Sequence, residues 1–214
     1  MHNSVVQILI TNKLINMDKT ITFKGKYLSR TIVKNNIIKV YNQSTHKNDW
    51  YKDANMFCKY LSDKYKVPFN SVVGIVSALS PLKTWDKNQE IAEYFLDKRL
   101  IKKDNKFIQL PNQCIKAEAI LYTDNEVEIL DILSGEKTKS FYLNIRYPER
   151  ITDVTIDRHA ISIALGRISN DFEQQLSTKQ YKWFVDVYKW TAKSLGIRPL
   201  LLQSITWETW RNIK

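Results

Sequence analysis

Cysteine and histidine are scarce in this sequence, and their scarcity removes several kinds of metal site. The two cysteines, Cys58 and Cys114, stand far apart, so they cannot build an all-cysteine zinc site or an iron–sulfur cluster. The three histidines are isolated, and neither an HExxH nor a CxxC motif occurs. We therefore expect no structural metal and no cofactor.

Glycine is also rare, with five residues in the whole chain. None of them forms a GxGxxG or GxxxxGK[ST] loop, which excludes nucleotide-driven phosphoryl transfer on a P-loop scaffold. Gly74 lies within an apolar segment, where we expect it to permit close helix packing. Gly166 stands where a helix should end, which is a common place for glycine.

Long apolar runs are missing as well. No stretch approaches the roughly 20 residues that span a bilayer, and the first apolar run, Val5–Ile10, lacks the flanks of a signal peptide. These absences predict a cytoplasmic protein without a membrane partner. Met17 could be an alternative start, so the first 16 residues could be dispensable.

The chain has an excess of positive charge. Lys and Arg number 33 against 22 Asp and Glu, which gives a formal net charge of +11. Such a charge favours polyanionic partners and makes their binding depend on salt. Double-stranded DNA is the partner that we expect, although small lysine-rich proteins can be basic without binding anything specific.

The pattern of apolar residues predicts a mainly α fold, either a single domain or two closely packed helical lobes with the active cleft between them. Residues 1–28 read as an N-terminal extension with strand-like pieces at Val5–Ile10 and Thr20–Phe23, and residues 29–214 as a single domain. An apolar stripe of helical period runs from Trp50 to Tyr65. Further helices are predicted over residues 72–79, with an N-cap at Asn70-Ser71, and over 85–100, 137–145, 157–165, 179–195 and 200–212.

Two segments carry the candidate chemistry. The first segment has a helix–hairpin–helix pattern, with a short helix, a turn at Gly135 and a new helix that begins at Lys137. In the second segment, Asp157 is the first residue of a later helix. The first turn of a helix lies at the positive end of its dipole, which favours the uncharged amine that a nucleophilic lysine needs. The exposed N–H groups of the hairpin also suit a DNA phosphate.

Each of these residues has a simpler structural explanation. Asp157 is well placed to be only an N-cap, and His159 to be a packed or capping residue. Lys137 and Lys139 can be solvated surface lysines. The aromatic residues Trp183, Phe184, Tyr188 and Trp190 on the predicted helix 179–195 are typical of a core stripe. Lys179, Lys182, Lys189 and Lys193 on that helix form either a phosphate-facing ridge or a solvated face.

Read together, these segments resemble the helix-hairpin-helix DNA glycosylase superfamily, of which endonuclease III is a member. The pattern Leu-Pro-Gly-Val-Gly-x-Lys-Thr-Ala of that family is matched in part by Leu133–Thr138, and its Val-Asp-Thr-His-Val element by Ile156–Ala160. Ile75–Ser80 with Asn88, and Lys116–Leu121, resemble two upstream elements. The four segments occur in the family's order and cover roughly residues 70–170.

The resemblance implies a DNA N-glycosylase that cleaves the glycosidic bond of an extruded, modified base. Asp157 would be the catalytic acid that stabilises the positively charged sugar. Lys137 would be the amine that attacks C1′ and gives AP-lyase activity, a role that Lys139 could fill instead. The residues proposed to contact DNA or the base are Gly135, Lys139, Trp85, Asn88, Tyr142, Arg158, His159 and Gln203.

The sequence also departs from the family pattern. The hairpin has one glycine where the family has two, and the C-terminal iron–sulfur loop is missing. Residues 78–88, 139–142 and 203–207 look more like a phage-encoded branch that includes base-hypermodification enzymes. Two alternatives therefore stay open, a hypermodification transferase on the same fold and a non-catalytic DNA-binding protein. The expected setting is a bacterial or phage-infected cytoplasm, and the favoured state is a monomer.

Overall fold

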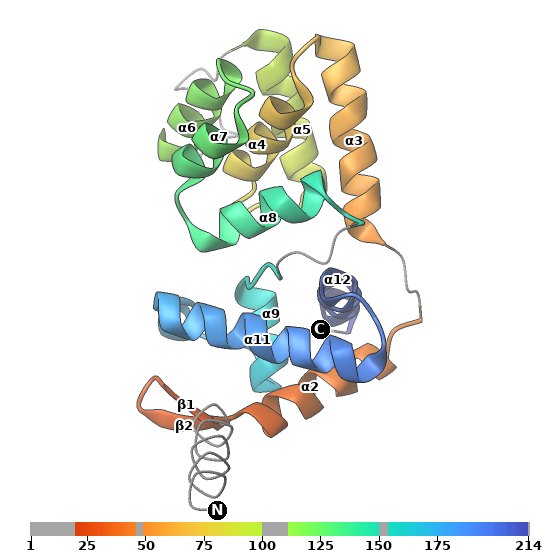
Figure 1. Cartoon of the computed structure of the whole chain (residues 1–214), viewed down its shortest axis with the longest axis vertical. Helices are drawn as coiled ribbons and strands as arrows, with labels where there is room; N and C mark the ends of the chain where they lie inside the picture. Colours follow the sequence, from red (N-terminus) through yellow and green to blue (C-terminus); the bar gives the residue numbers. More distant parts are fainter. Residues whose placement is uncertain (1–19, 46–48, 100–110, 150–153, 214) are drawn as a thin grey trace, which may run out of the picture. The chain divides into compact units, whose positions relative to one another are not determined.

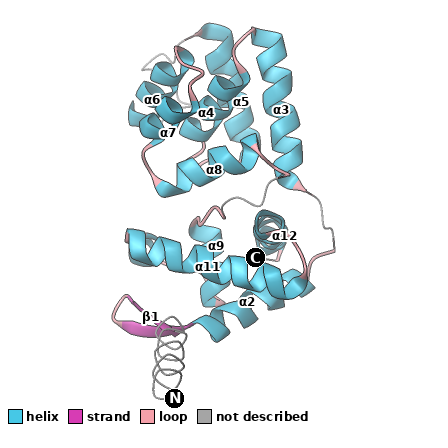
Figure 2. Cartoon of the chain, viewed as in Figure 1, coloured by secondary structure: helices cyan, strands magenta, loops and turns pink. Residues whose placement is uncertain are grey.

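The computed structural model describes residues 20–45, 49–99, 111–149 and 154–213, and the fold in these ranges is mainly helical (Figures 1 and 2). The chain forms two compact units. Unit 1 comprises Met1–Asn48 and Ile156–Lys214, and unit 2 comprises Asp49–Thr155. The predicted α class is confirmed. No helix within the described ranges is long and apolar enough to cross a membrane.

Unit 2 is built around one buried helix. Its elements are α3 (Trp50–Tyr65), α4 (Phe69–Leu79), α5 (Trp85–Lys98), α6 (Pro111–Leu121), α7 (Glu126–Leu133) and α8 (Glu136–Arg146). Every residue of α4 from Ser71 to Leu79 is buried, and this helix contacts the other five (Figure 1). An apolar helix surrounded in this way needs no polar face, which agrees with its continuous apolar sequence.

The predicted N-cap of α4 is wrong in position. The helix begins at Phe69, with Pro68 as the N-cap residue. Asn70 Nδ2 donates a hydrogen bond to the Asp124 carbonyl oxygen, and Ser71 Oγ donates one to that of Thr123. Because these side chains tie α4 to the segment before α7, they are not used to cap the helix.

Gly74 permits close packing of helices in unit 2, as the sequence predicted. A Cβ atom at this position would lie 2.8 Å from Ile120 Cγ2 and 2.8 Å from Ile129 Cγ2. Both methyl groups sit on β-branched, fully buried side chains, so they have little freedom to move aside. The absence of a side chain at Gly74 therefore lets α6 and α7 approach α4.

We expect Gly74→Ala to lower the free energy of unfolding by about 1–3 kcal/mol, because overpacking outweighs the better helix propensity of alanine. Urea unfolding followed by circular dichroism measures this change. Gly135→Ala is the control, since a Cβ there would meet only Thr138 Oγ1 at 3.4 Å, and its cost should stay near 0.5 kcal/mol. Equal effects of the two substitutions would contradict the packing argument.

Unit 1 joins the beginning and the end of the chain. Its elements are β1 (Thr20–Phe23), β2 (Lys26–Ser29), α2 (Arg30–Asn42), α9 (Arg158–Leu165), α10 (Asp171–Gln174), α11 (Thr178–Leu195) and α12 (Pro199–Asn212). Helices α2, α9 and α12 pack against one another, and α11 packs against α2 and α12. In Figure 1 the red and orange N-terminal elements therefore lie beside the blue C-terminal helices.

The N-terminal hairpin confirms the strand predicted at Thr20–Phe23, whereas the strand predicted at Val5–Ile10 lies outside the described residues. β1 and β2 pair antiparallel, with Phe23 opposite Lys26. Lys24 and Gly25 form the two-residue turn, both with positive φ, which suits the twist of a tight hairpin. Phe23 packs edge-on against Phe184 of α11, with ring centroids 5.5 Å apart, so the hairpin belongs to the core of unit 1.

The short helix α10 is held by a buried carboxylate. Glu173 accepts hydrogen bonds from Arg167 Nη1 at 2.9 Å and from the Asn170 backbone N–H at 3.0 Å, which completes a capping box with Asn170. The Arg167 guanidinium holds the pKa of Glu173 below its usual range, and the Asn170 N–H adds to this effect. The charged carboxylate is therefore the form that stabilises this turn.

A lowered pKa in the folded state gives stability that is present above the pKa of the unfolded chain, about 4.3, and is lost as the pH falls through the folded value. We expect Glu173→Gln to cost about 1 kcal/mol at pH 7 and to make unfolding less sensitive to pH between about 5 and 3 than in the wild type. Urea unfolding at both pH limits tests this. Asp171→Asn, on the same turn but exposed, should change little, and a pH dependence retained by Glu173→Gln would refute the assignment.

Candidate functional site

The predicted helical hairpin is present in unit 2. α7 ends at Leu133, Ser134 and Gly135 make the turn, and α8 begins at Glu136. The sharp change of direction falls on Ser134, whose φ is 59°, while Gly135 is extended with φ −82°. Gly135 is the N-cap residue of α8, and no side chain caps the helix. The first N–H groups of α8 thus remain available to an acceptor outside the helix.

Two side chains stabilise this turn, and neither was predicted to do so from the sequence. Thr138 Oγ1 donates to the carbonyl oxygen of Gly135 at 2.9 Å and lies 3.2 Å from that of Leu133. Lys116 of α6 donates from Nζ to the Leu133 carbonyl at 2.8 Å and to Ser134 Oγ at 2.7 Å. The Lys116 ammonium thereby binds the C-terminal end of α7, where a positive charge is favourable.

The two lysines of the hairpin are partly exposed. Lys137 is the second residue of α8 and Lys139 the fourth, so about 200° of rotation around the helix separates them. Among the described residues, neither ammonium group has a hydrogen-bond or ion-pair partner. Each is therefore able to meet a phosphate or a substrate, but they project from opposite sides of α8.

Asp157 is the N-cap of α9 in unit 1, as the structural explanation of this residue predicted. Its Oδ1 atom accepts hydrogen bonds from the backbone N–H groups of His159 at 3.0 Å and Ala160 at 2.8 Å. The carboxylate is half-buried, and within the described ranges Oδ2 accepts no hydrogen bond. The two hydrogen bonds to Oδ1 therefore fix the orientation of the carboxylate, and Oδ2 can accept a hydrogen bond from a ligand.

A buried tyrosine lies close enough to Asp157 to sense its charge. Tyr188 of α11 is fully buried and donates its hydroxyl hydrogen to the Ala160 carbonyl oxygen at 3.2 Å. Burial raises the pKa of Tyr188, and the negative charge of Asp157 raises it further. Tyr188 therefore stays neutral, and its hydrogen bond to Ala160 stabilises the first turn of α9. The sequence pattern had indicated only that this residue belongs to a core stripe.

The neighbours of Asp157 in sequence form a partly exposed surface. Arg158 is exposed, and its Nε lies 3.4 Å from His159 Nε2. His159 is half-buried and meets Trp207 of α12 edge-on, with ring centroids 6.2 Å apart. Gln203 lies on α12, which packs against α9, and is buried. Arg158 and His159 thus accompany Asp157 at the surface of unit 1, whereas Gln203 is inside.

Two other predicted contacts belong to the interior of unit 2. Asn88 is 2% exposed, and its Nδ2 donates to the Val76 carbonyl oxygen. Tyr142 is fully buried, and its hydroxyl lies 3.5 Å from Glu126 Oε2. Burial and the charge of Glu126 raise the pKa of Tyr142. The burial of both residues gives them a structural role within unit 2 and leaves a direct contact with DNA unsupported.

Trp85 belongs to an aromatic cluster in unit 2. Its ring centroid lies 4.7 Å from that of Trp50 and 5.7 Å from that of Phe57, both in edge-on geometry. Trp85 is half-buried, so part of its indole remains accessible. Of Trp85, Asn88 and Tyr142, Trp85 is the one that the structure leaves partly at the surface.

The predicted site residues therefore fall into two groups that belong to different units. Unit 2 holds Gly135, Lys137 and Lys139 on the hairpin, and unit 1 holds Asp157, Arg158 and His159 around the start of α9. No group of three or more His, Cys, Asp or Glu that could hold a metal ion occurs among the described residues. The chemistry that these groups offer is that of a lysine amine, an oriented carboxylate and free helix N–H groups.

The comparisons with other proteins give one finding. The model of a family of unknown function, DUF7178, matches residues 19–214. No curated protein and no solved structure matches the chain significantly.

Proposed function

We propose that this chain, which belongs to the DUF7178 family, is a DNA-acting enzyme of the helix-hairpin-helix glycosylase kind that cleaves the N-glycosidic bond of an extruded, modified base. The observation that carries the proposal is the carboxylate of Asp157, fixed through Oδ1 by two backbone N–H groups with Oδ2 left over. A fixed negative charge of this kind stabilises the positive sugar that develops as the base leaves.

The hairpin supplies the second part of the proposal. Its helix start has no side-chain cap, and its two lysines have no partner in the part of the chain that the structure describes. Both features suit a DNA phosphate, which accepts hydrogen bonds from backbone N–H groups and from lysine. The +11 charge of the chain supplies the attraction to the duplex. Extrusion of the base gives the enzyme access to C1′.

Two routes complete the reaction. In the first, water adds to C1′ as the base departs, and the base takes up the proton that water loses. In the second, the amine of Lys137 forms a bond to C1′ as the bond to the base breaks, and the departing base takes up one amine proton. The second amine proton then moves to the ring oxygen as the sugar ring opens, which leaves an imine between Lys137 and C1′. Lys139 is the alternative amine. Borohydride reduces the imine and traps the protein on DNA, so the two routes are separable.

The experiment is an assay of the whole chain on duplex DNAs that carry normal, damaged and phage-type modified bases. Free base is measured by mass spectrometry, and covalent protein–DNA adduct by gel after borohydride. We expect release of one modified base, and DNA affinity that falls steeply with salt. Binding without release on every duplex would overturn the glycosylase proposal, and a flat salt response would overturn the role of DNA.

A further inference from the structure

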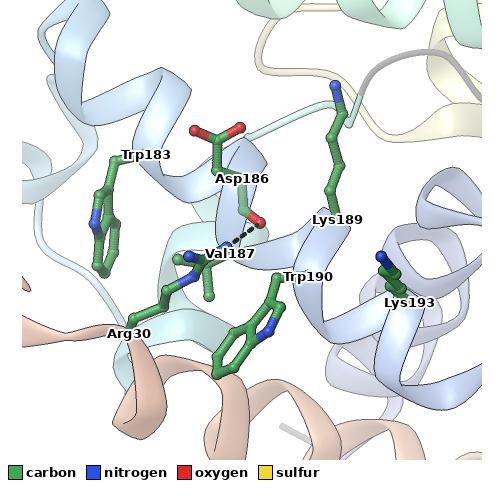
Figure 3. A pocket seen from close by; sticks show the side chains of 7 residues that line it. All are labelled: Arg30, Trp183, Asp186, Val187, Lys189, Trp190 and Lys193. Carbon is green, nitrogen blue, oxygen red and sulfur yellow. Dashed lines mark hydrogen bonds between the residues drawn. The ribbon is translucent and has the colours of Figure 1, made fainter. Parts of the chain in front are cut away.

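A pocket of about 340 Å³ in unit 1 has no role in the reaction described above. It is lined by Arg30, Trp183, Asp186, Val187, Lys189, Trp190 and Lys193 (Figure 3). Arg30 is the first residue of α2, and the other six residues lie on α11. Two helices about 150 residues apart in sequence therefore form this pocket, which combines three cationic side chains, two indoles and one carboxylate.

The Arg30 side chain contacts α11 through its guanidinium group, but one N–H donor of this group has no hydrogen-bond partner among the described residues. In Figure 3 its side chain reaches from α2 toward α11, where Nη2 lies 3.4 Å from the Asp186 backbone oxygen. The guanidinium carbon lies 4.6 Å from the centre of the Trp190 ring. The Nε atom is buried, with no hydrogen-bond partner among the described residues. An oriented guanidinium with a spare donor is suited to bind an oxyanion.

Trp190 orients a second cation as well. Lys34 Nζ lies 4.4 Å from the centre of its ring, so the indole holds both Arg30 and Lys34 by cation–π contacts. The ring of Trp190 thus gathers two cations at one side of the pocket, which favours a ligand of negative charge.

The other unsatisfied group in the pocket wall is also a donor. Trp183 is 8% exposed, and its Nε1 has no hydrogen-bond partner within the described part of the chain. A buried N–H without a partner costs free energy, which a ligand acceptor would recover. Arg30, Lys189 and Lys193 line the pocket together with one carboxylate, that of the exposed Asp186. The ligand that fits is therefore an anion rich in acceptors.

The surroundings of the pocket favour a polyanion over a free ion. Lys179, Lys182, Asp186, Lys189 and Lys193 recur every three or four residues along α11 and therefore share one face of the helix. From Lys179 to Lys193 this face extends about 21 Å. Four lysines spread over that length, with one carboxylate among them, match the repeated phosphates of a nucleic-acid strand, whereas a single phosphate would use only the pocket.

We propose that this pocket binds a phosphate group of a DNA backbone, with the lysines of α11 following the same strand. The inference rests on the proposed function for the identity of the polymer, but neither Lys137 nor Asp157 lines the pocket. Arg30 and Trp183 donate hydrogen bonds to the phosphate oxygens, and Lys189 and Lys193 neutralise its charge.

The test compares two double variants that remove the same charge from unit 1. Lys189→Gln/Lys193→Gln changes the pocket, and Lys26→Gln/Lys39→Gln changes two exposed lysines that do not line it. Duplex affinity is measured by fluorescence anisotropy over a range of salt. We expect the pocket variant to bind about tenfold more weakly near 0.1 M salt and to lose about 1–2 from the slope of log K against log salt. The control should change affinity about threefold or less, with its slope kept.

Equal losses of DNA affinity in the two variants would contradict the assignment of the pocket as a phosphate site, because net charge alone would then explain binding. Inorganic phosphate is a second probe, followed by tryptophan fluorescence. A phosphate response that the pocket variant loses, with DNA binding unchanged, would assign the pocket to a free ion and overturn the proposal. Base release at saturating DNA tests the proposed function separately, because the pocket variant should keep it while Asp157→Asn should not.

Discussion

Asp157→Asn is expected to abolish base release while the protein stays folded and binds DNA almost as well as the wild type. Asparagine is about as good an N-cap as aspartate, so the hydrogen bonds from the His159 and Ala160 N–H groups to Oδ1 can be kept. What disappears is the negative charge opposite the developing positive sugar. We expect a rate loss of about 10²-fold to 10⁴-fold, the range found when a fixed charge or an acid–base group is removed.

Asp157→Ala is the matched variant that separates catalysis from capping. Alanine loses the charge and also the cap, so it should cost about 1 kcal/mol of stability in addition to the activity. Thermal unfolding, DNA affinity and base release are measured for both variants. If Asp157→Asn keeps base release and only Asp157→Ala fails, Asp157 is a structural cap and the catalytic assignment is wrong.

Lys137→Ala is expected to remove the borohydride-trapped adduct completely, because no other amine would form the imine with C1′. The companion variant is Lys139→Ala, which removes the same charge from the same turn of α8. Since the two side chains project about 200° apart around the helix, only one of them can meet a given sugar. Trapping of the modified-base duplex is measured for both variants, with DNA affinity as a second readout.

The outcomes of this pair are distinct. An adduct lost only in Lys139→Ala would transfer the role of the amine to Lys139. Base released by the wild type without any adduct would mean that water is the nucleophile and that both lysines serve phosphate binding. Both residues lack partners among the described residues, so neither substitution should lower the free energy of unfolding by more than about 0.5 kcal/mol.

The helices were largely predictable because they follow from local patterns. The stripe from Trp50 to Tyr65 became α3 with its predicted bounds. The apolar run around Gly74 became a buried helix, and Gly166 ends α9 with φ 69°. Amphipathic period, capping residues and a glycine that tolerates positive φ act within one or two turns, so the sequence contains the needed information.

The candidate site was predictable only in its parts. The hairpin and the acid at the start of α9 were both found from the sequence, and Asp157 does cap its helix. Lys116 was missed as a support of the hairpin turn, since its partners Leu133 and Ser134 lie 17 and 18 residues away. Asn88 and Tyr142 were predicted to face DNA but are buried, because helical period does not tell a core stripe from a binding stripe.

The sequence by itself determined the helical class, the capping of α9, the hairpin and the excess of positive charge, because each of these depends on neighbouring residues or on composition. Only the tertiary structure brought Arg30 of α2 beside Trp190 and Lys193 of α11. It also brought the hydroxyl group of Tyr188 into hydrogen-bond contact with Ala160 at the start of α9. Contacts of this kind join residues far apart in the chain, and they form only when apolar helix faces are buried against one another.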